Sequence, residues 1–254
     1  MRKGCVMDQY KSRKTRSDKG LVSFTDRDLH VLPWIAEQYA ARRDQVQYLL
    51  GLEAGRGAVV EGEISASAAR QVIERWRRAG WIVQKKVFAK DPPWLWPTAR
   101  LLRLLELPYK AYEPSCVRLE HIFATNEVRL SIEDVWPQYQ WISERRMRAE
   151  IPYEKGVSLP HIPDGKLITD RERVIVEIEL TPKHSTELSA ILEELANTYE
   201  TVWYFATKET RPALEAALAK LDPALAMQIH VYSYSLEEGT DTSEGWAFED
   251  QDYP

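Results

Sequence analysis

Three acidic residues in the second half of the chain have the types and the spacing of a metal site. Asp164 stands in the motif Pro163-Asp164-Gly165, at the start of an expected strand, and Glu177 and Glu179 lie two residues apart in the next one. Because side chains alternate along a strand, these two glutamates point to the same face of the sheet. If the two strands pair as a hairpin, the three carboxylates converge. Mg²⁺ and Mn²⁺ prefer such oxygen ligands, and a bound cation neutralises the charge that develops on a reacting phosphodiester.

The same acids have a second interpretation, in which Glu177 and Glu179 face solvent at a sheet edge. The alternation Val-Glu-Ile-Glu-Leu over residues 176–180 permits it. Burying acids in an apolar strand costs free energy unless they are paired or bind a metal, and this cost is the argument for a site. His121 and His161 are candidate further ligands. The glycines form neither a P-loop nor a dinucleotide fingerprint, so nucleotide-dependent chemistry has no support.

The second chemical feature is a group of basic side chains between residues 65 and 110, where ten Lys and Arg occur with only three acids. An amphipathic helix is expected there, with its cap at Ser65 or Ser67 and its end at Gly80. Alternating residues, a proline turn and a second short apolar run over residues 82–96 then predict a hairpin.

Two earlier helices are expected at residues 26–40 and 43–52, where Pro33 kinks the first or moves its start. Three helices and a hairpin form the outline of a winged helix-turn-helix, whose third helix enters the DNA major groove while the hairpin touches the flanking backbone. Two other interpretations are a basic helix face that is only solvated and a helix-turn-helix that docks a protein. The candidate DNA-binding residues are Arg70, Arg75, Arg77, Arg78, Lys85, Lys86 and Lys90.

The net charge of −5 conceals a segregated distribution. Residues 1–20 contain seven basic and two acidic side chains, and residues 237–254 contain seven acids and no base. Both segments have the composition of disordered chain, which predicts a basic arm and an acidic tail. A basic N-terminal half joined to an acidic remainder is typical of a polyanion-binding module attached to another domain. The acidic total therefore does not exclude DNA.

The rest of the chain predicts an α/β domain at residues 115–236, after a winged helix at 21–110 and a proline-containing linker. A long helix at 117–136 is followed by a strand at 141–144 and an irregular stretch through Pro163. The alternation of strands and helices that follows predicts a partly parallel sheet. Its expected elements are strands at 162–169 and 173–181, a helix at 185–199, a strand at 201–207, a helix at 211–221 and a strand at 227–235.

Composition excludes several classes of protein. No apolar run approaches the roughly 20 residues that cross a bilayer, and the N-terminus lacks an apolar signal core. Two cysteines, Cys5 and Cys116, cannot form a disulfide framework or a four-thiolate zinc site. These features predict a soluble, cytoplasmic protein with no membrane partner.

A set of motifs along the chain resembles a known family. They are the winged-helix pattern, Leu119-Glu-His121 followed by Asn126 and Arg129, then Pro163-Asp164-Gly165, and finally Val176-Glu177-Ile-Glu179-Leu-Thr181-Pro-Lys183. In this combination the chain is similar to the replication-relaxation protein family of actinobacterial and Firmicute plasmids and integrative elements. The resemblance implies a winged helix fused to a domain with the PD-(D/E)xK nuclease-like fold, in proteins associated with plasmid replication, relaxation and mobilisation.

The resemblance also assigns roles by position. Asp164 matches the Asp of the PD motif, Glu177 matches the acid of (D/E)xK, and Glu120 is an additional acid of the kind that this superfamily uses. The expected Lys is replaced by Glu179, which gives E-x-E, a form with which some restriction endonucleases of the superfamily are active. Lys183, four residues further on, is the candidate basic partner. The implied cofactor is Mg²⁺ or Mn²⁺.

Three functions follow as hypotheses. The first is a DNA-binding accessory protein of plasmid or mobile-element replication, relaxation or mobilisation, whose nuclease-like domain serves contact or assembly. The second is a Mg²⁺-dependent DNA nickase or endonuclease. The third is a winged-helix transcription regulator. All three imply double-stranded DNA as a partner, and replication or mobilisation proteins and a second copy of the chain are further expected partners.

Overall fold

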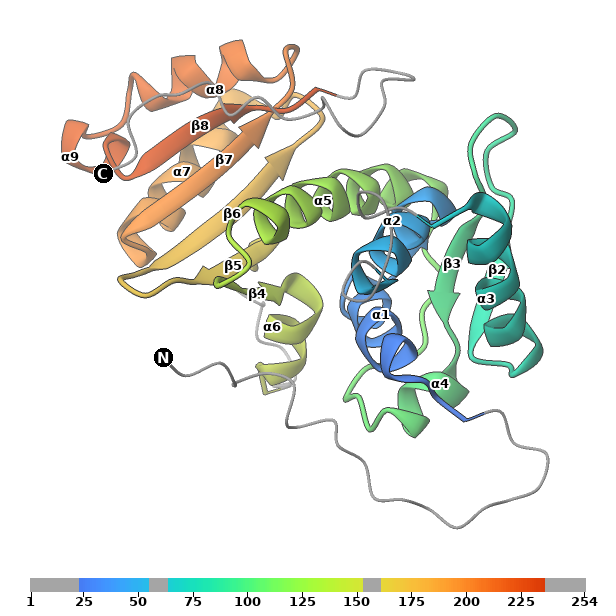
Figure 1. The fold of residues 1–254 in the computed structure, drawn as a ribbon. Coiled ribbons are helices and arrows are strands. Elements are labelled where there is room, and N and C mark those ends of the chain that lie inside the picture. The colour runs from blue at the N-terminus through green and yellow to red at the C-terminus, as the bar shows by residue number, and fades with distance from the viewer. Residues whose placement is uncertain (1–22, 55–63, 153–160, 236–254) are drawn as a thin grey trace. The chain divides into compact units, whose positions relative to one another are not determined.

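The computed structural model describes residues 23–54, 64–152 and 161–235 (Figure 1). Helices and strands both contribute to it, which confirms a mixed helix and sheet class. The chain divides into two compact units, residues 1–123 and 124–254, and the division falls inside a long helix.

Two predictions lie outside the described residues, namely the basic arm of residues 1–20 and the acidic tail of residues 237–254. Among the helices that are described, none is long and apolar enough to span a bilayer.

The N-terminal unit combines short helices with a small antiparallel sheet in which β3 pairs with both β1 and β2. The three expected helices and the expected hairpin are present. The described elements, in chain order, are α1 (Asp26–Glu37), β1 (Ala41–Arg42), α2 (Arg43–Ala54), α3 (Ala66–Arg78), β2 (Ile82–Lys85), β3 (Trp94–Pro97), α4 (Ala99–Leu104) and the first part of α5 (Cys116–Val135).

Helix α1 begins where its cap dictates. Thr25 and Asp28 form a capping box, in which each side chain accepts a hydrogen bond from the other residue's backbone N–H. The helix then runs through Pro33, which is buried within it. Of the two expectations for Pro33, a later helix start is therefore wrong, because α1 already begins at Asp26 after the Thr25 cap.

Helix α3 has the expected ends. The Ser65 hydroxyl accepts from the backbone N–H of Ala68, and Gly80, with φ of 70°, follows the C-cap. The N–H of Gly80 donates to the carbonyl of Arg77 and that of Trp81 to Trp76, which is the Schellman pattern that favours glycine. One side of the helix is buried, and Arg70, Arg77 and Arg78 lie on the exposed side.

The C-terminal unit is a five-stranded sheet in the order β4-β5-β6-β7-β8. Neighbours from β4 to β6 are antiparallel and those from β6 to β8 are parallel, which confirms both the expected hairpin and the partly parallel sheet. Its elements after α5 are β4 (Gln140–Ser143), α6 (Glu144–Glu150), β5 (Gly165–Ile168), β6 (Arg173–Glu179), α7 (Ser185–Thr198), β7 (Thr201–Ala206), α8 (Arg211–Leu218), α9 (Pro223–Ala226) and β8 (Ile229–Ser233).

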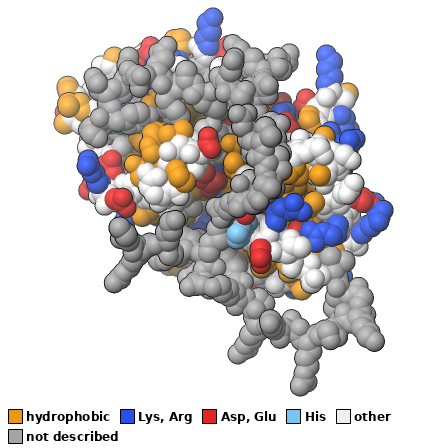
Figure 2. All heavy atoms as spheres, in the orientation of Figure 1, with side chains coloured by type: hydrophobic (Ala, Val, Ile, Leu, Met, Phe, Trp, Pro, Cys, Tyr) orange, Lys and Arg blue, Asp and Glu red, His pale blue; other side chains and the backbone are white. Residues whose placement is uncertain are grey.

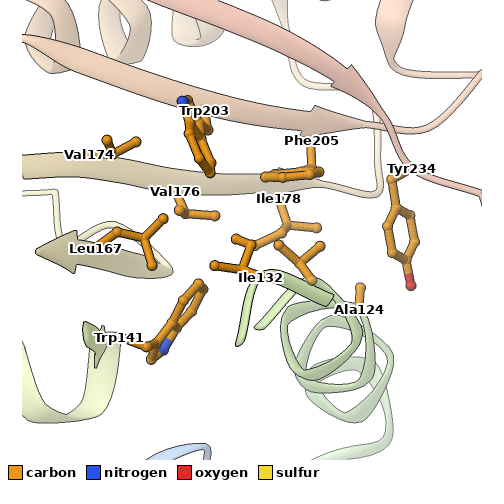
Figure 3. Packing of buried hydrophobic residues seen from close by; sticks show 11 residues of the cluster. Ala124, Ile132, Trp141, Leu167, Val174, Val176, Ile178, Trp203, Phe205 and Tyr234 are labelled. Atoms are coloured by element: carbon orange, nitrogen blue, oxygen red, sulfur yellow. The ribbon is translucent and has the colours of Figure 1, made fainter. Parts of the chain in front are cut away.

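Helices cover both faces of this sheet (Figure 1). On one face, Val176 and Ile178 of β6 pack with Ile132 of α5 and with Trp141 and Phe205 (Figure 3). The opposite face packs against α7 and α8, in a cluster that includes Ile175 of β6. Strand β6 is therefore central in the sheet and covered on both sides.

Candidate functional site

Glu177 and Glu179 lie on the sheet face that carries Ile175, as the alternation of side chains requires. They are only 7% and 4% exposed, respectively. The interpretation in which they face solvent at a sheet edge is therefore wrong, because β6 is an inner strand. Two acids in such a position require partners.

Asp164 is held beside Glu177 by the hairpin. Gly165 pairs with Val176 in the antiparallel register, so the residue before Gly165 lies opposite Glu177. The Oδ2 atom of Asp164 accepts a hydrogen bond from the backbone N–H of Ile178 at 2.9 Å. The aspartate is thus bonded to the strand that carries both glutamates.

Glu177 is hydrogen-bonded to a histidine. Its Oε1 lies 2.7 Å from Nε2 of His161. Burial, together with the nearby charge of Asp164, raises the pKa of Glu177 to about 7, although the His161 hydrogen bond opposes the shift. The same hydrogen bond raises the pKa of His161. Near neutral pH the pair therefore retains a proton that an exposed glutamate would have released.

Glu179 is bound by two donors. Its Oε2 forms an ion pair with Lys183 and accepts a hydrogen bond from the hydroxyl of Tyr204 at 3.1 Å. Burial, together with the charges of Glu179 and Glu177, raises the pKa of Tyr204, so the hydroxyl stays protonated and donates. Tyr204 was not predicted from the sequence as a site residue. The parallel pairing of β7 with β6 places Tyr204 opposite Glu177, and this register is what brings the tyrosine to the site.

The donor chemistry of Asp164 and Glu177 fits a hard divalent cation. Burial and mutual repulsion oppose the ionisation of Glu177, and a cation would reverse both effects. As the side chains lie, however, no three His, Cys, Asp or Glu residues in the described part of the chain form a group that could hold a metal ion. Glu120 is exposed on the part of α5 that belongs to the N-terminal unit.

A hollow of about 450 Å³ opens beside this site, between α6 and α7. Lys166, Glu194 and Tyr199 contribute to its wall together with His161. Because His161 also bonds Glu177, the buried carboxylate is one side chain away from the hollow.

In the N-terminal unit, the outward side of α3 carries Arg70, Arg77 and Arg78, all exposed. Figure 2 shows Lys and Arg side chains over this helix and the adjacent hairpin. Arg77 and Arg78 both form ion pairs with Glu74, at 2.7 Å each. Exposed pairs of this kind contribute little to stability, so a phosphate can compete with Glu74 for these arginines.

Arg75 points in a different direction from these three. Its guanidinium pairs with Asp28 at 2.5 Å, and the indole N–H of Trp76 donates to the same oxygen at 2.7 Å. Asp28 is fully buried, whereas the Arg75 side chain is 30% exposed. Arg75 therefore joins α3 to α1, and its guanidinium is directed at the interior of the unit.

The hairpin lysines are at the surface. Lys85 pairs with the exposed Glu113 at 2.9 Å, Lys86 donates to the backbone carbonyl of Asp91, and Lys90 is exposed near the tip. The structure therefore places the basic side chains of α3 and of the hairpin within one unit, where all except Arg75 are accessible.

Comparison with known proteins finds no matching family model, no matching curated protein and no matching solved structure. The family suggested by the sequence motifs stays a prediction, and the function must be argued from the residues and their geometry.

Proposed function

We propose that this chain is a double-stranded DNA-binding protein whose N-terminal unit acts as a winged helix. The observation that carries the proposal is the exposed arginine side of α3, the third of three successive helices that a hairpin follows. The buried side of the same helix is apolar, so packing fixes which side faces outward. The order α1-β1-α2-α3-β2-β3 agrees with a helix-turn-helix followed by a wing.

In this proposal α3 enters the major groove. Arginines on such a helix make bidentate contacts with guanine or bind phosphates, and lysines on the wing contact the flanking backbone. Arg70, Arg77 and Arg78 are the candidates on α3, while Arg75 acts indirectly by holding the helix in place. Lys85, Lys86 and Lys90 are the candidates on the hairpin.

The cellular role rests on the motif resemblance. We infer an accessory role in plasmid or mobile-element replication, relaxation or mobilisation, with the C-terminal unit as a nuclease-like domain that contributes contact or assembly. The position of Asp164 directly before β5, beside Glu177 on the paired strand β6, supports the nuclease-like assignment. Replication or mobilisation proteins would be the partners in that role.

A gel shift tests the proposal. The intact chain should retard a short duplex, and Lys85→Ala with Lys86→Ala should weaken the complex at every sequence because backbone contacts carry no sequence information. Asp44→Ala is a control elsewhere in the unit. No retardation at low salt would refute the proposal.

A second candidate function, a Mg²⁺- or Mn²⁺-dependent endonuclease, is favoured by the buried carboxylates on β6 and the residue before β5. A cation there would stabilise the charge on a reacting phosphodiester and activate a water. Asp164 and Glu177 would hold it, His161 would have to release Glu177, and Lys183 would remain paired with Glu179 beside them.

Supercoiled plasmid incubated with Mg²⁺ or Mn²⁺ tests this second function. Conversion to open-circle or linear DNA that disappears in both Asp164→Ala and Glu177→Ala would support it. Equal conversion by wild type and variants would indicate a contaminating nuclease, and no conversion of plasmids that carry the bound sequence would refute cleavage.

A further inference from the structure

The only acid on α3 lies among its exposed arginines. Helix α3 spans Ala66–Arg78 and contains one acidic residue, Glu74. We propose that Glu74 sets the selectivity of this helix, by positioning Arg77 and Arg78 and by opposing contact with the phosphate backbone. The inference rests on the proposed DNA-binding function and names the residue that would regulate it.

One carboxylate orients two guanidinium groups. Nε and a terminal nitrogen of Arg77 donate to the two oxygens of Glu74 at 2.7 and 2.9 Å, and Nε of Arg78 donates to Oε1 at 2.7 Å. Long arginine side chains otherwise lose much rotamer freedom when they bind. A guanidinium has five N–H donors, so one that is bonded to Glu74 still has donors for a base edge.

The same carboxylate reduces the attraction to phosphate. The hydrogen bonds from Arg77 and Arg78 lower the pKa of Glu74 to about 2, so the residue is ionised throughout the neutral range. Its negative charge offsets one of the two arginines and repels nearby phosphates. A carboxylate in the major groove can instead accept a hydrogen bond from the amino group of cytosine. Glu74 therefore weakens DNA binding that depends only on charge attraction to phosphates. It weakens binding that reads base edges less.

The test is Glu74→Gln in the intact chain, titrated against a fluorescent duplex of mixed sequence over a range of salt. Because glutamine keeps the shape and removes the charge, affinity at low salt should rise about 3- to 10-fold. The plot of log affinity against log salt should steepen by about 1, the value for one newly neutralised phosphate. Glu74→Asp, which keeps the negative charge, should have an affinity and a salt slope closer to those of wild type than Glu74→Gln has.

The matched control is Glu215→Gln. Glu215 forms the same kind of exposed pair, four residues from Arg211 at 2.8 Å, on α8 of the other unit. This variant should leave affinity and salt dependence unchanged. Thermal melting of all variants checks that the fold is intact, and a role limited to helix stability would change melting without changing the salt slope.

The outcomes separate the inference from the function on which it rests. If the wild type binds the duplex but Glu74→Gln binds within twofold of it, or more weakly, with the same salt slope, the role of Glu74 is refuted and DNA binding stands. If the wild type does not bind the duplex, both fall together.

Discussion

Substitution of Gly165 by alanine tests the geometry that places Asp164. A methyl group at this position would lie 2.9 Å from Cε2 of the Trp141 ring and closer still to Cζ2 and Cη2. Trp141 is 5% exposed and packs with Leu167 and Val176, so the ring has little space to move (Figure 3). Overpacking of this kind costs about 1–3 kcal/mol, and we expect Gly165→Ala to lower the free energy of unfolding by that amount.

The assay is urea unfolding of the intact chain, with hydrogen exchange of β5 and β6 to locate the effect in the C-terminal unit. Trp141→Phe supplies the matched background, because it makes room for the methyl group. The indole N–H has no hydrogen-bond partner within the described residues, so its loss costs no hydrogen bond there. The double-mutant cycle should show a favourable coupling of about 1 kcal/mol or more.

A free energy of unfolding for Gly165→Ala within about 0.5 kcal/mol of wild type, the range expected for a substitution without a specific effect, would show that Trp141 does not exclude the methyl group. A penalty of the same size in the Trp141→Phe background would show instead that the strain does not come from this ring.

Two further predictions concern buried acids. Asp28→Ala removes the acceptor of the Trp76 indole N–H and should lower the free energy of unfolding, measured by heat or urea, by about 2–4 kcal/mol. The control Asp44→Ala removes a side chain that is 45% exposed and should lower it by less than about 1 kcal/mol. Equal losses in the two variants would contradict this prediction. The folded His161–Glu177 pair keeps a proton that the unfolded chain releases, so unfolding free energy should fall as pH rises from about 5 to 8. Glu177→Gln should flatten that dependence and be the more stable protein at the upper end; an unchanged profile would argue against a shared proton.

Local chemistry made much of the fold predictable. The Ser65 cap and the Gly80 stop predicted the two ends of α3 from short motifs. The β5–β6 hairpin and the buried run of β6 followed from side-chain alternation and turn residues.

Helix α6 was missed because its sequence Glu-Arg-Arg-Met-Arg-Ala-Glu has no apolar periodicity. It is stabilised instead by the Ser143 cap and by ion pairs four residues apart, Glu144 with Arg148 and Arg146 with Glu150. The short helix α9, capped by Asp222, was missed for a similar reason.

The candidate sites depended on contacts between distant segments, which a sequence pattern does not contain. Arg75 resembled its neighbours until its partner Asp28, 47 residues earlier, was seen to hold it. Likewise, alternation alone permitted Glu177 to be buried or exposed, and only the position of β6 between β5 and β7 decided between them.

In our proposal, α3 binds the DNA duplex through its exposed arginines. The most direct test is a fluorescence anisotropy titration of the intact chain with a mixed-sequence duplex at several salt concentrations, beside a variant with Arg70, Arg77 and Arg78 changed to alanine. We expect wild-type affinity to fall steeply with salt, the variant complex to be at least tenfold weaker, and the variant's salt slope to be flatter by about 1 or more. A wild type that does not bind, or a variant that binds equally well with the same slope, would contradict it.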